Sequence, residues 1–263
     1  MPFQYKPSTS RSARLARRLG SLGLPVLVIA AVGHHFDWLG TDHALAALLV
    51  GFGLAALALL AGIIGLIVIW NEGDLGATDA ALGIVYALIA LAPLAPLGYE
   101  LWRYPKLTDI STDIIDPPLY RSAALLRAGH DNSARPPSPE ALKLQRAAYP
   151  DIVTRRFSVG SDLVYVAAKK VVERHGWQIL EAQPPKDDND RARIETVART
   201  MIMGFAEDIV IRIVGEPSGA RIDIRSSSRF GRHDLGDNAR RIRAFLAELD
   251  TAMAESYGQS SGD

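Results

Sequence analysis

The chain has 263 residues, a formal net charge of zero and a hydrophobic content of 48%. It contains no cysteine, which excludes a disulfide framework and a catalytic thiol. The apolar residues are concentrated between Leu19 and Leu101, whereas charged residues are frequent from Arg103 onward. This asymmetry indicates that the two parts of the chain are suited to different solvents.

Two apolar segments in the first half predict membrane-spanning helices. The segment from His43 to Trp70 contains no Lys, Arg, Asp or Glu and exceeds the roughly 20 residues that a spanning helix needs. The segment from about Ala80 to Gly98 is equally apolar, and aromatic residues of the kind found at membrane interfaces follow it. These aromatic residues are Tyr99, Trp102 and Tyr104.

A third apolar segment, from about Leu19 to Phe36, precedes these two. It is shorter, contains Pro25 and follows a basic tail, so a cleaved signal peptide is the alternative to a spanning helix. The sequence Gly33-His34-His35 lacks the small-x-small pattern of a cleavage site and favours the spanning helix.

The basic residues near the membrane predict the orientation. The loops 37–42 and 71–79 hold no basic residue, and only Arg103 and Lys106 follow the third helix closely. The tail holds Lys6, Arg11, Arg14, Arg17 and Arg18. Because basic residues stay on the cytoplasmic side, we expect a cytoplasmic N-terminus in the inner (plasma) membrane. Three crossings then place the soluble domain in the periplasm or another extracytoplasmic space.

The second half predicts an α+β domain with an antiparallel sheet of about four strands and the helices on one face. An amphipathic helix covers 160–176, a short helix covers 140–148, and a final helix runs from Asp234, its expected N-cap, to Ser256. The expected strands are Trp177–Ala182, Arg193–Met203, Asp208–Val214 and Arg221–Ser228. The turn Glu216-Pro217-Ser218-Gly219 should join the last two strands as a hairpin.

The predicted organisation has five parts. They are a basic cytoplasmic tail (1–18), a three-helix membrane anchor (19–102), an extended arm with loops (103–157), the α+β domain (158–258) and a disordered tail (259–263). The arm is expected from YPKLTDISTDIIDPP (104–118), which has three prolines and no helical stripe.

Four strings of the soluble half resemble the bacterial domain-of-unknown-function family 1499. They are YPKLTDISTDIIDPP (104–118), QRAAYPDI (145–152), GFAEDIVIRI (204–213) and IDIRSSSRFGRHDLGDNARRIRAFL (222–246). The resemblance spans about residues 104–250. It implies membrane helices in the N-terminal part of the chain and placement in the bacterial envelope. It implies no enzymatic activity, substrate or catalytic residue.

Alternation along the last strand places arginines on one face of the sheet. Arg225, Ser227 and Arg229 share this face, and Arg212 joins it from the neighbouring strand. One interpretation is a basic patch for an anionic group, since guanidinium matches carboxylate or phosphate. The alternative is a ladder of cross-strand ion pairs, such as Arg212 with Asp223, on a solvated face.

The loop Ser226–Gly236 (SSSRFGRHDLG) is the most specific feature of the chain. Arg232 and His233 lie just before a helix N-terminus, where unpaired N–H groups favour anions. Asp234 and Asp237 already place carboxylates there, so a self-satisfied cap is the alternative. The hypothetical anion site therefore consists of Arg212, Arg225, Ser227, Arg229, Arg232 and His233.

Catalytic and metal motifs are absent from the sequence. It has no Gly-x-Ser-x-Gly elbow, phosphate loop or His-Glu-x-x-His helix. His34, His35 and His43 with Asp37 and Asp42 are dense enough to suggest a transition metal, but an interfacial polar cap is the simpler interpretation. We expect no catalytic residue, no metal and no cofactor.

Two functions stay open at this stage. The first is a non-catalytic envelope protein that binds an anionic small molecule, a lipid headgroup or an envelope protein, with the lipid bilayer as its other partner and no nucleic acid. The second is an envelope hydrolase or transferase that uses the 226–234 loop. Three helices without a charge at mid-span indicate an anchor rather than a transport path.

Overall fold

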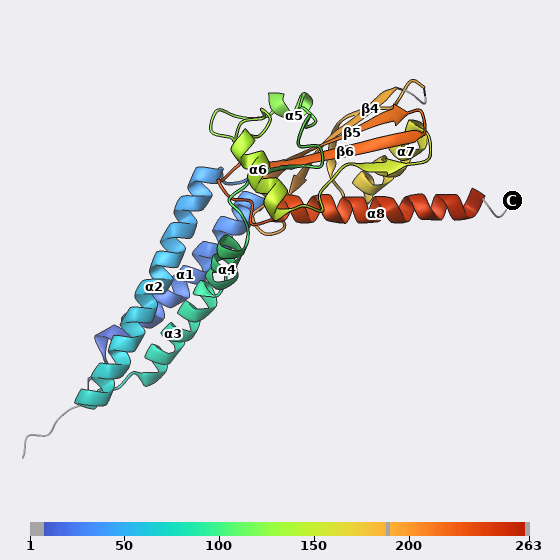
Figure 1. Cartoon of the computed structure of the whole chain (residues 1–263). Coiled ribbons are helices and arrows are strands. Elements are labelled where there is room, and N and C mark those ends of the chain that lie inside the picture. The colour runs from blue at the N-terminus through green and yellow to red at the C-terminus, as the bar shows by residue number, and fades with distance from the viewer. Residues whose placement is uncertain (1–7, 188–189, 261–263) are drawn as a thin grey trace, which may run out of the picture. The chain divides into compact units, whose positions relative to one another are not determined.

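The computed structural model describes residues 8–187 and 190–260 (Figure 1). The chain separates into two compact units, one formed by residues 1–99 and 201–204 and the other by residues 100–200 and 205–263. The first unit is helical, and the second contains all the strands.

The helical unit confirms the three expected apolar helices. They are α1 (Arg11–His35), α2 (Thr41–Glu72) and α3 (Ala77–Leu91), which α4 (Leu94–Arg103) continues. The stretches 11–35, 41–72 and 77–103 are long and apolar enough to cross a membrane. The third stretch breaks between α3 and α4 at Pro93, which has no N–H for a helical hydrogen bond.

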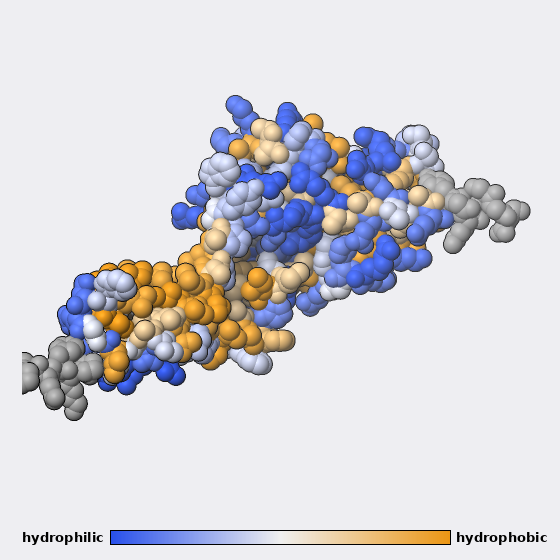
Figure 2. Space-filling view, turned by 90° about the horizontal axis from the view of Figure 1, so that it is seen from below, coloured by the Kyte–Doolittle hydropathy of each residue, from blue (hydrophilic) through white to orange (hydrophobic). Residues whose placement is uncertain are grey.

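Small residues form the interior of the helical unit, and large aliphatic residues cover its surface. The side chain of Ile29 is 64% exposed and that of Leu49 is 75% exposed, and Figure 2 shows hydrophobic residues over the helices. This distribution suits lipid, because the hydrophobic effect does not drive helices together there and close packing needs small residues. The buried positions include Ala13, Ala16, Gly20, Gly23, Gly51, Ala55, Ala58, Gly62, Gly65, Ala80, Gly83 and Ala87.

A close backbone contact between α1 and α3 allows a test of this packing. A Cβ atom added at Gly83 would lie 2.5 Å from the backbone carbon of Ala16, whereas one added at Gly53 would meet nothing within 4 Å. Gly83→Ala should therefore lower the melting temperature of the protein in detergent, because α1 and α3 must separate. Gly53→Ala, the matched control, should leave it unchanged or raise it slightly, since alanine favours helix. Equal melting temperatures for the two variants would contradict this packing.

The soluble unit contains an antiparallel sheet in the order β1-β6-β5-β4-β3, with β2 also paired to β6. Four strands are present where they were expected, as β3 (Gln178–Gln183), β4 (Arg191–Arg199), β5 (Ala206–Glu216) and β6 (Gly219–Ser228). The strand β4 ends at Arg199 and not at Met203 as predicted, because residues 201–203 form the turn that leads into β5. The hairpin of β5 and β6 has the expected turn at Pro217 and Ser218. The α+β class is thus confirmed, with two more strands than expected.

Those two strands, β1 (Asp109–Ser111) and β2 (Arg155–Phe157), lie along the free edge of β6. They are three residues long, too short for an alternating pattern to be visible in the sequence. Because β1 pairs with residues 225–227 and β2 with residues 220–222, the arm that contains them belongs to the domain.

The helices α7 (Ser161–Arg174) and α8 (Asp237–Ser260) pack on one face of the sheet, as expected. Isoleucines of β5 and β6 meet Val164, Val171, Ile242 and Phe245 in the main core. Such alternation of buried Ile with polar residues is what a sheet with one apolar face requires.

The start of α8 lies three residues after the predicted one. Asp234 precedes the helix, and its carboxylate accepts hydrogen bonds from the backbone N–H groups of Gly236 (2.9 Å) and Asn238 (3.2 Å). The carboxylate thus satisfies helix-end donors as predicted, from outside the N-cap position. The helix continues through Ser260, beyond the predicted end at Ser256 and into the tail predicted as disordered. Residues 261–263 of that tail, like residues 1–7 of the basic tail, lie outside the described residues.

The opposite face of the sheet is covered rather than solvated. The segment from Thr112 to Arg135, which includes α5 (Ser122–Leu125), lies over it, and Tyr120 and Ala123 pack on Val210. The helix α6 (Pro139–Ala148) follows this covering segment, and the buried Gln145 bonds both backbone groups of Ser111. The polar side chains of β5 and β6 therefore lie between two layers of protein.

Candidate functional site

Arg225 of β6 is the most completely buried cation of the covered face. Its side chain is 0% exposed, and its guanidinium donates to both carboxylate oxygens of Asp109, at 2.9 and 2.6 Å. It also donates to the carbonyls of Pro118 (3.0 Å) and Arg135 (2.7 Å) and lies 4.6 Å from the ring centre of Tyr120. One side chain of the sheet therefore binds β1 and two separate parts of the covering segment.

Asp208 of β5 is a second buried centre. Its side chain is 0% exposed and accepts from two arginines, Arg127 at 2.8 Å and Arg229 at 2.7 and 2.9 Å. Arg127 also donates to the hydroxyl of Ser227 at 3.1 Å. Burial raises the pKa of Tyr120, whose hydroxyl donates to the Asp208 carbonyl at 3.0 Å, well above its ordinary value.

Arg212 of β5 forms the third centre, where the expected pair with Asp223 is present at 2.9 Å. Two aspartates of the arm add to it, Asp113 at 2.8 Å and Asp116 at 2.7 Å. Asp113 also accepts from the backbone N–H groups of Ile115 and Asp116, so it closes a turn as well. The aspartates of the arm are thus counterions of the sheet arginines.

These contacts bear directly on the predicted anion site. That hypothesis needs guanidinium groups that lack full internal pairing, and Arg212, Arg225 and Arg229 do not meet this condition. Arg232 is exposed and, among the residues that the structure describes, makes no ion pair. The cross-strand ion pairs of the alternative interpretation are present, but they are buried.

The buried pairing predicts a large loss of stability on removal of one partner. Arg225→Ala leaves Asp109 without its counterion and should lower the free energy of unfolding by about 3–5 kcal/mol. Arg232→Ala, an exposed control on the loop that follows β6, should stay within about 0.5 kcal/mol of the parent. Thermal or denaturant unfolding of the full chain in detergent measures both. A loss for Arg225→Ala no larger than that of the control would contradict the role of this pair.

The loop Ser226–Gly236 is occupied by internal contacts. The hydroxyls of Ser226 and Ser228 donate to Asn238 (2.6 Å) and Glu207 (2.9 Å). One ring nitrogen of His233 lies 3.1 Å from the carbonyl oxygen of Tyr104, and the other accepts from the N–H of Leu235. Both ring nitrogens thus have backbone partners, which does not favour His233 as the base of a serine nucleophile.

Glu207 lies on the helix-facing side of β5 and is nearly completely buried. Its carboxylate accepts from Ser228 and lies 3.3 Å from a guanidinium nitrogen of Arg241. Burial raises its pKa from the ordinary 4.5 to about 7, against the lowering effect of Arg241. Burial also raises the pKa of Asp234 nearby. Sequence reasoning missed Glu207, since a lone acidic residue at a strand start carries no signal of burial.

The raised pKa makes stability depend on pH. The folded state holds a proton on Glu207 that the unfolded state releases, so stability is full below about pH 4.5 and falls as pH rises through 7. The loss attributable to Glu207 is at most about 3 kcal/mol. Glu207→Gln should flatten the fall between pH 5 and pH 8, whereas the exposed control Glu255→Gln should keep it. Parallel pH profiles for the parent and Glu207→Gln would show that the carboxyl is charged throughout.

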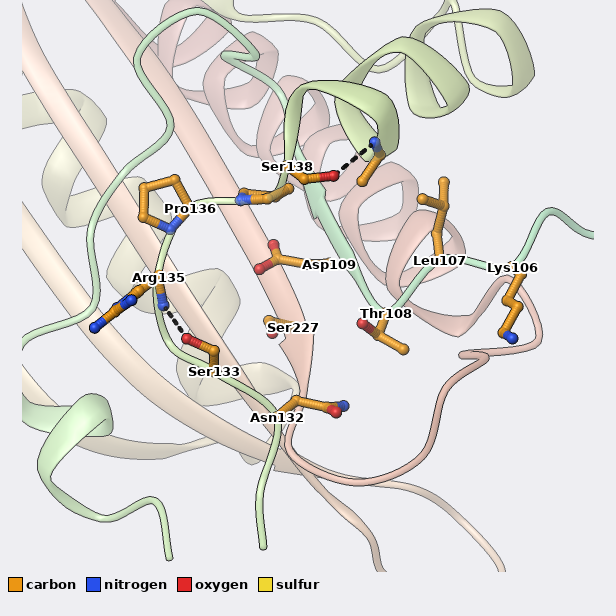
Figure 3. A pocket seen from close by; sticks show the side chains of 12 residues that line it. Lys106, Leu107, Thr108, Asp109, Asn132, Ser133, Arg135, Pro136, Ser138 and Ser227 are labelled. Atoms are coloured by element: carbon orange, nitrogen blue, oxygen red, sulfur yellow. Dashed lines mark hydrogen bonds between the residues drawn. The ribbon is translucent and has the colours of Figure 1, made fainter. Parts of the chain in front are cut away.

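A cavity of about 270 Å³ lies where the arm meets the loop that precedes α6 (Figure 3). Hydroxyl or amide groups come from Thr108, Asn132, Ser133, Ser138 and Ser227, and Leu107 and Ala141 add apolar surface. Of the predicted site residues, Ser227 lines this cavity.

The charged groups of the cavity are Asp109, Lys106 and Arg135. Asp109 is neutralised by Arg225. The Arg135 side chain points away from the other labelled side chains in Figure 3, so it lines the cavity mainly with its backbone. Lys106 is exposed and leaves one positive charge at the rim. The arrangement offers hydrogen bonds and a single cation to a polar ligand.

No group of three or more metal-ligating side chains occurs among residues 8–187 and 190–260. His34 is buried, and one of its ring nitrogens lies 3.1 Å from the hydroxyl oxygen of Thr41. The histidine-rich end of the helices thus shows no metal cluster in its described part.

Comparison with known proteins places the soluble unit in a family. The family described as protein of unknown function, DUF1499, matches residues 109–249, which is more than half of the chain. The chain belongs to this family. The DUF1499 match begins at Asp109 and includes its partner Arg225, so the covered ionic face lies inside the family domain. A comparison with curated proteins found no match.

Proposed function

We propose that this DUF1499 protein is a non-catalytic binding module of the bacterial envelope, held in the inner membrane by its three helices. The observation that carries the proposal is the cavity beside the arm, whose only lining carboxylate is already neutralised by Arg225. Hydroxyl groups and one ammonium suit a phosphate-bearing polar group, either a lipid headgroup or a free phosphate ester.

The short connection to the membrane supports a lipid headgroup as one source. The helix α4 ends at Arg103, and Lys106 at the cavity rim follows only three residues later. Three residues span at most about 11 Å, so the rim stays near the membrane surface. The alternative function, a hydrolase or transferase that uses residues 226–234, gains no support from the internally bonded Ser226, Ser228 and His233.

The orientation is part of the proposal and has its own test. The basic tail supports a cytoplasmic N-terminus and a periplasmic domain. A reporter that is active only in the periplasm, fused after Asp263, should therefore be active. Activity of a cytoplasmic reporter at the same position would contradict the proposed localisation.

Lys106→Gln should weaken binding of a phosphate-bearing ligand by about five- to thirtyfold, because a charge-assisted hydrogen bond contributes about 1–2 kcal/mol. Native mass spectrometry of the full chain with added phosphatidylglycerol, and separately with glycerol phosphate, distinguishes the two sources. The control Lys143→Gln removes an exposed lysine of α6 that does not line the cavity.

A second variant tests the cavity without changing charge. Ala141→Leu fills space that the lining residue Ala141 leaves open, and Ala147→Leu adds the same groups at an exposed position of the same helix. Binding should fall for Ala141→Leu alone. Equal binding by both leucine variants and by both glutamine variants would refute the cavity as the binding site.

A further inference from the structure

The turn between β4 and β5, whose residues 201–204 group with the helical unit, carries a highly exposed pair of large apolar side chains. Met201 is 91% exposed and Ile202 is 74% exposed, side by side at the tip of the turn. Large apolar side chains exposed together on a turn indicate a contact with an apolar partner.

The turn is held in shape rather than extended at random. Thr200 and Phe205 close it through the backbone bond from Thr200 N–H to the Phe205 carbonyl (3.0 Å) and a bond from Phe205 N–H to the Thr200 hydroxyl (2.9 Å). The rings of Phe205 and Phe230 stack 5.5 Å apart at its base. A pre-ordered turn can bury its tip in a partner with little further loss of conformational entropy.

The turn also lies at the end of the sheet where the chain enters the domain from the membrane. The backbone N–H of Ser228 donates to the Thr108 carbonyl (2.8 Å), and that of Arg229 donates to the Ala206 carbonyl (3.1 Å). Residues 108, 206 and 228 therefore share one end of the sheet with the 200–205 turn, whereas the β5–β6 turn at Ser218 lies at the other end. Five residues, at most about 18 Å of chain, connect Arg103 to Thr108.

The charges around this end favour a membrane surface over a protein partner. Lys106, Arg199 and Arg232 are exposed there, and the nearby acidic residues Glu207 and Asp234 are buried. Basic residues that flank an apolar tip match the anionic headgroups above the hydrocarbon of a bilayer.

We propose that the β4–β5 turn inserts Met201 and Ile202 into the bilayer in which the helices of the same chain lie, so that the domain docks on the membrane surface. The partner that this apolar tip contacts is therefore the lipid of the bilayer. The docking fixes one end of the sheet at the headgroup level and leaves the opposite end, with Ser218, in water.

The cysteine-free chain allows a direct test with a single label. Met201→Cys and Ile202→Cys, each labelled with a nitrobenzoxadiazole fluorophore, are reconstituted as the full chain in vesicles of phosphatidylethanolamine and phosphatidylglycerol. Ser218→Cys at the opposite turn is the matched control. The emission maximum and quenching by lipids that carry a nitroxide on the acyl chain are measured for all three.

The proposal expects blue-shifted emission and severalfold stronger quenching at positions 201 and 202 than at position 218. Three results would overturn it. Weak quenching with water-like emission at all three positions places the turn in solvent. Blue-shifted emission at 201 and 202 without quenching by the nitroxide lipids places it against protein. Equal quenching at all three positions shows that the two ends of the sheet do not differ in depth, which contradicts docking through the turn.

Discussion

A guanidinium removed from water needs a carboxylate and several acceptors in fixed positions, and Arg225 finds them in segments far away along the chain. Asp109 is 116 residues away, the Pro118 carbonyl 107 and the Arg135 carbonyl 90. A buried ion pair of this kind adds little net stability compared with apolar packing, but it penalises every arrangement that leaves one charge unpaired. It therefore selects one position for the arm on the sheet.

The other buried polar contacts of the covered face also hold the covering segment on the sheet. Asp208 lies between Arg127 and Arg229, and the carboxylate of Glu195 accepts from the backbone N–H groups of Arg121 and Ala123, which fixes the start of α5. The sheet thus has an apolar side that packs against α7 and α8 and an ionic side that orders a segment with little regular structure. The cavity beside Asp109 exists because this segment is held in place.

Residue patterns predicted the parts of this fold that depend on local periodicity. The three apolar helices, the hairpin of β5 and β6 and the stripe of α8 follow from spacing alone. The pairing of Asp109 with Arg225 does not, because alternation shows which residues share a face but not what covers that face. The same limit explains the anion-site hypothesis. An arginine-rich strand has the same sequence whether its counterions come from a ligand or from the protein itself, as Asp109 and Asp208 do for Arg225 and Arg229. The cavity, built from three separate segments, had no sequence signal apart from Ser227.

Amide hydrogen exchange of the full chain in detergent tests most directly whether the arm is an ordered layer of the domain. The N–H of Thr112 donates to the Ile224 carbonyl, and those of Arg121 and Ala123 donate to Glu195, whereas the N–H of Ile115 donates to Asp113 at an exposed position. The account predicts slow exchange at 112, 121 and 123, comparable to the amides of β6, and fast exchange at 115. Exchange at the rate of an unstructured peptide throughout residues 109–125 would contradict it.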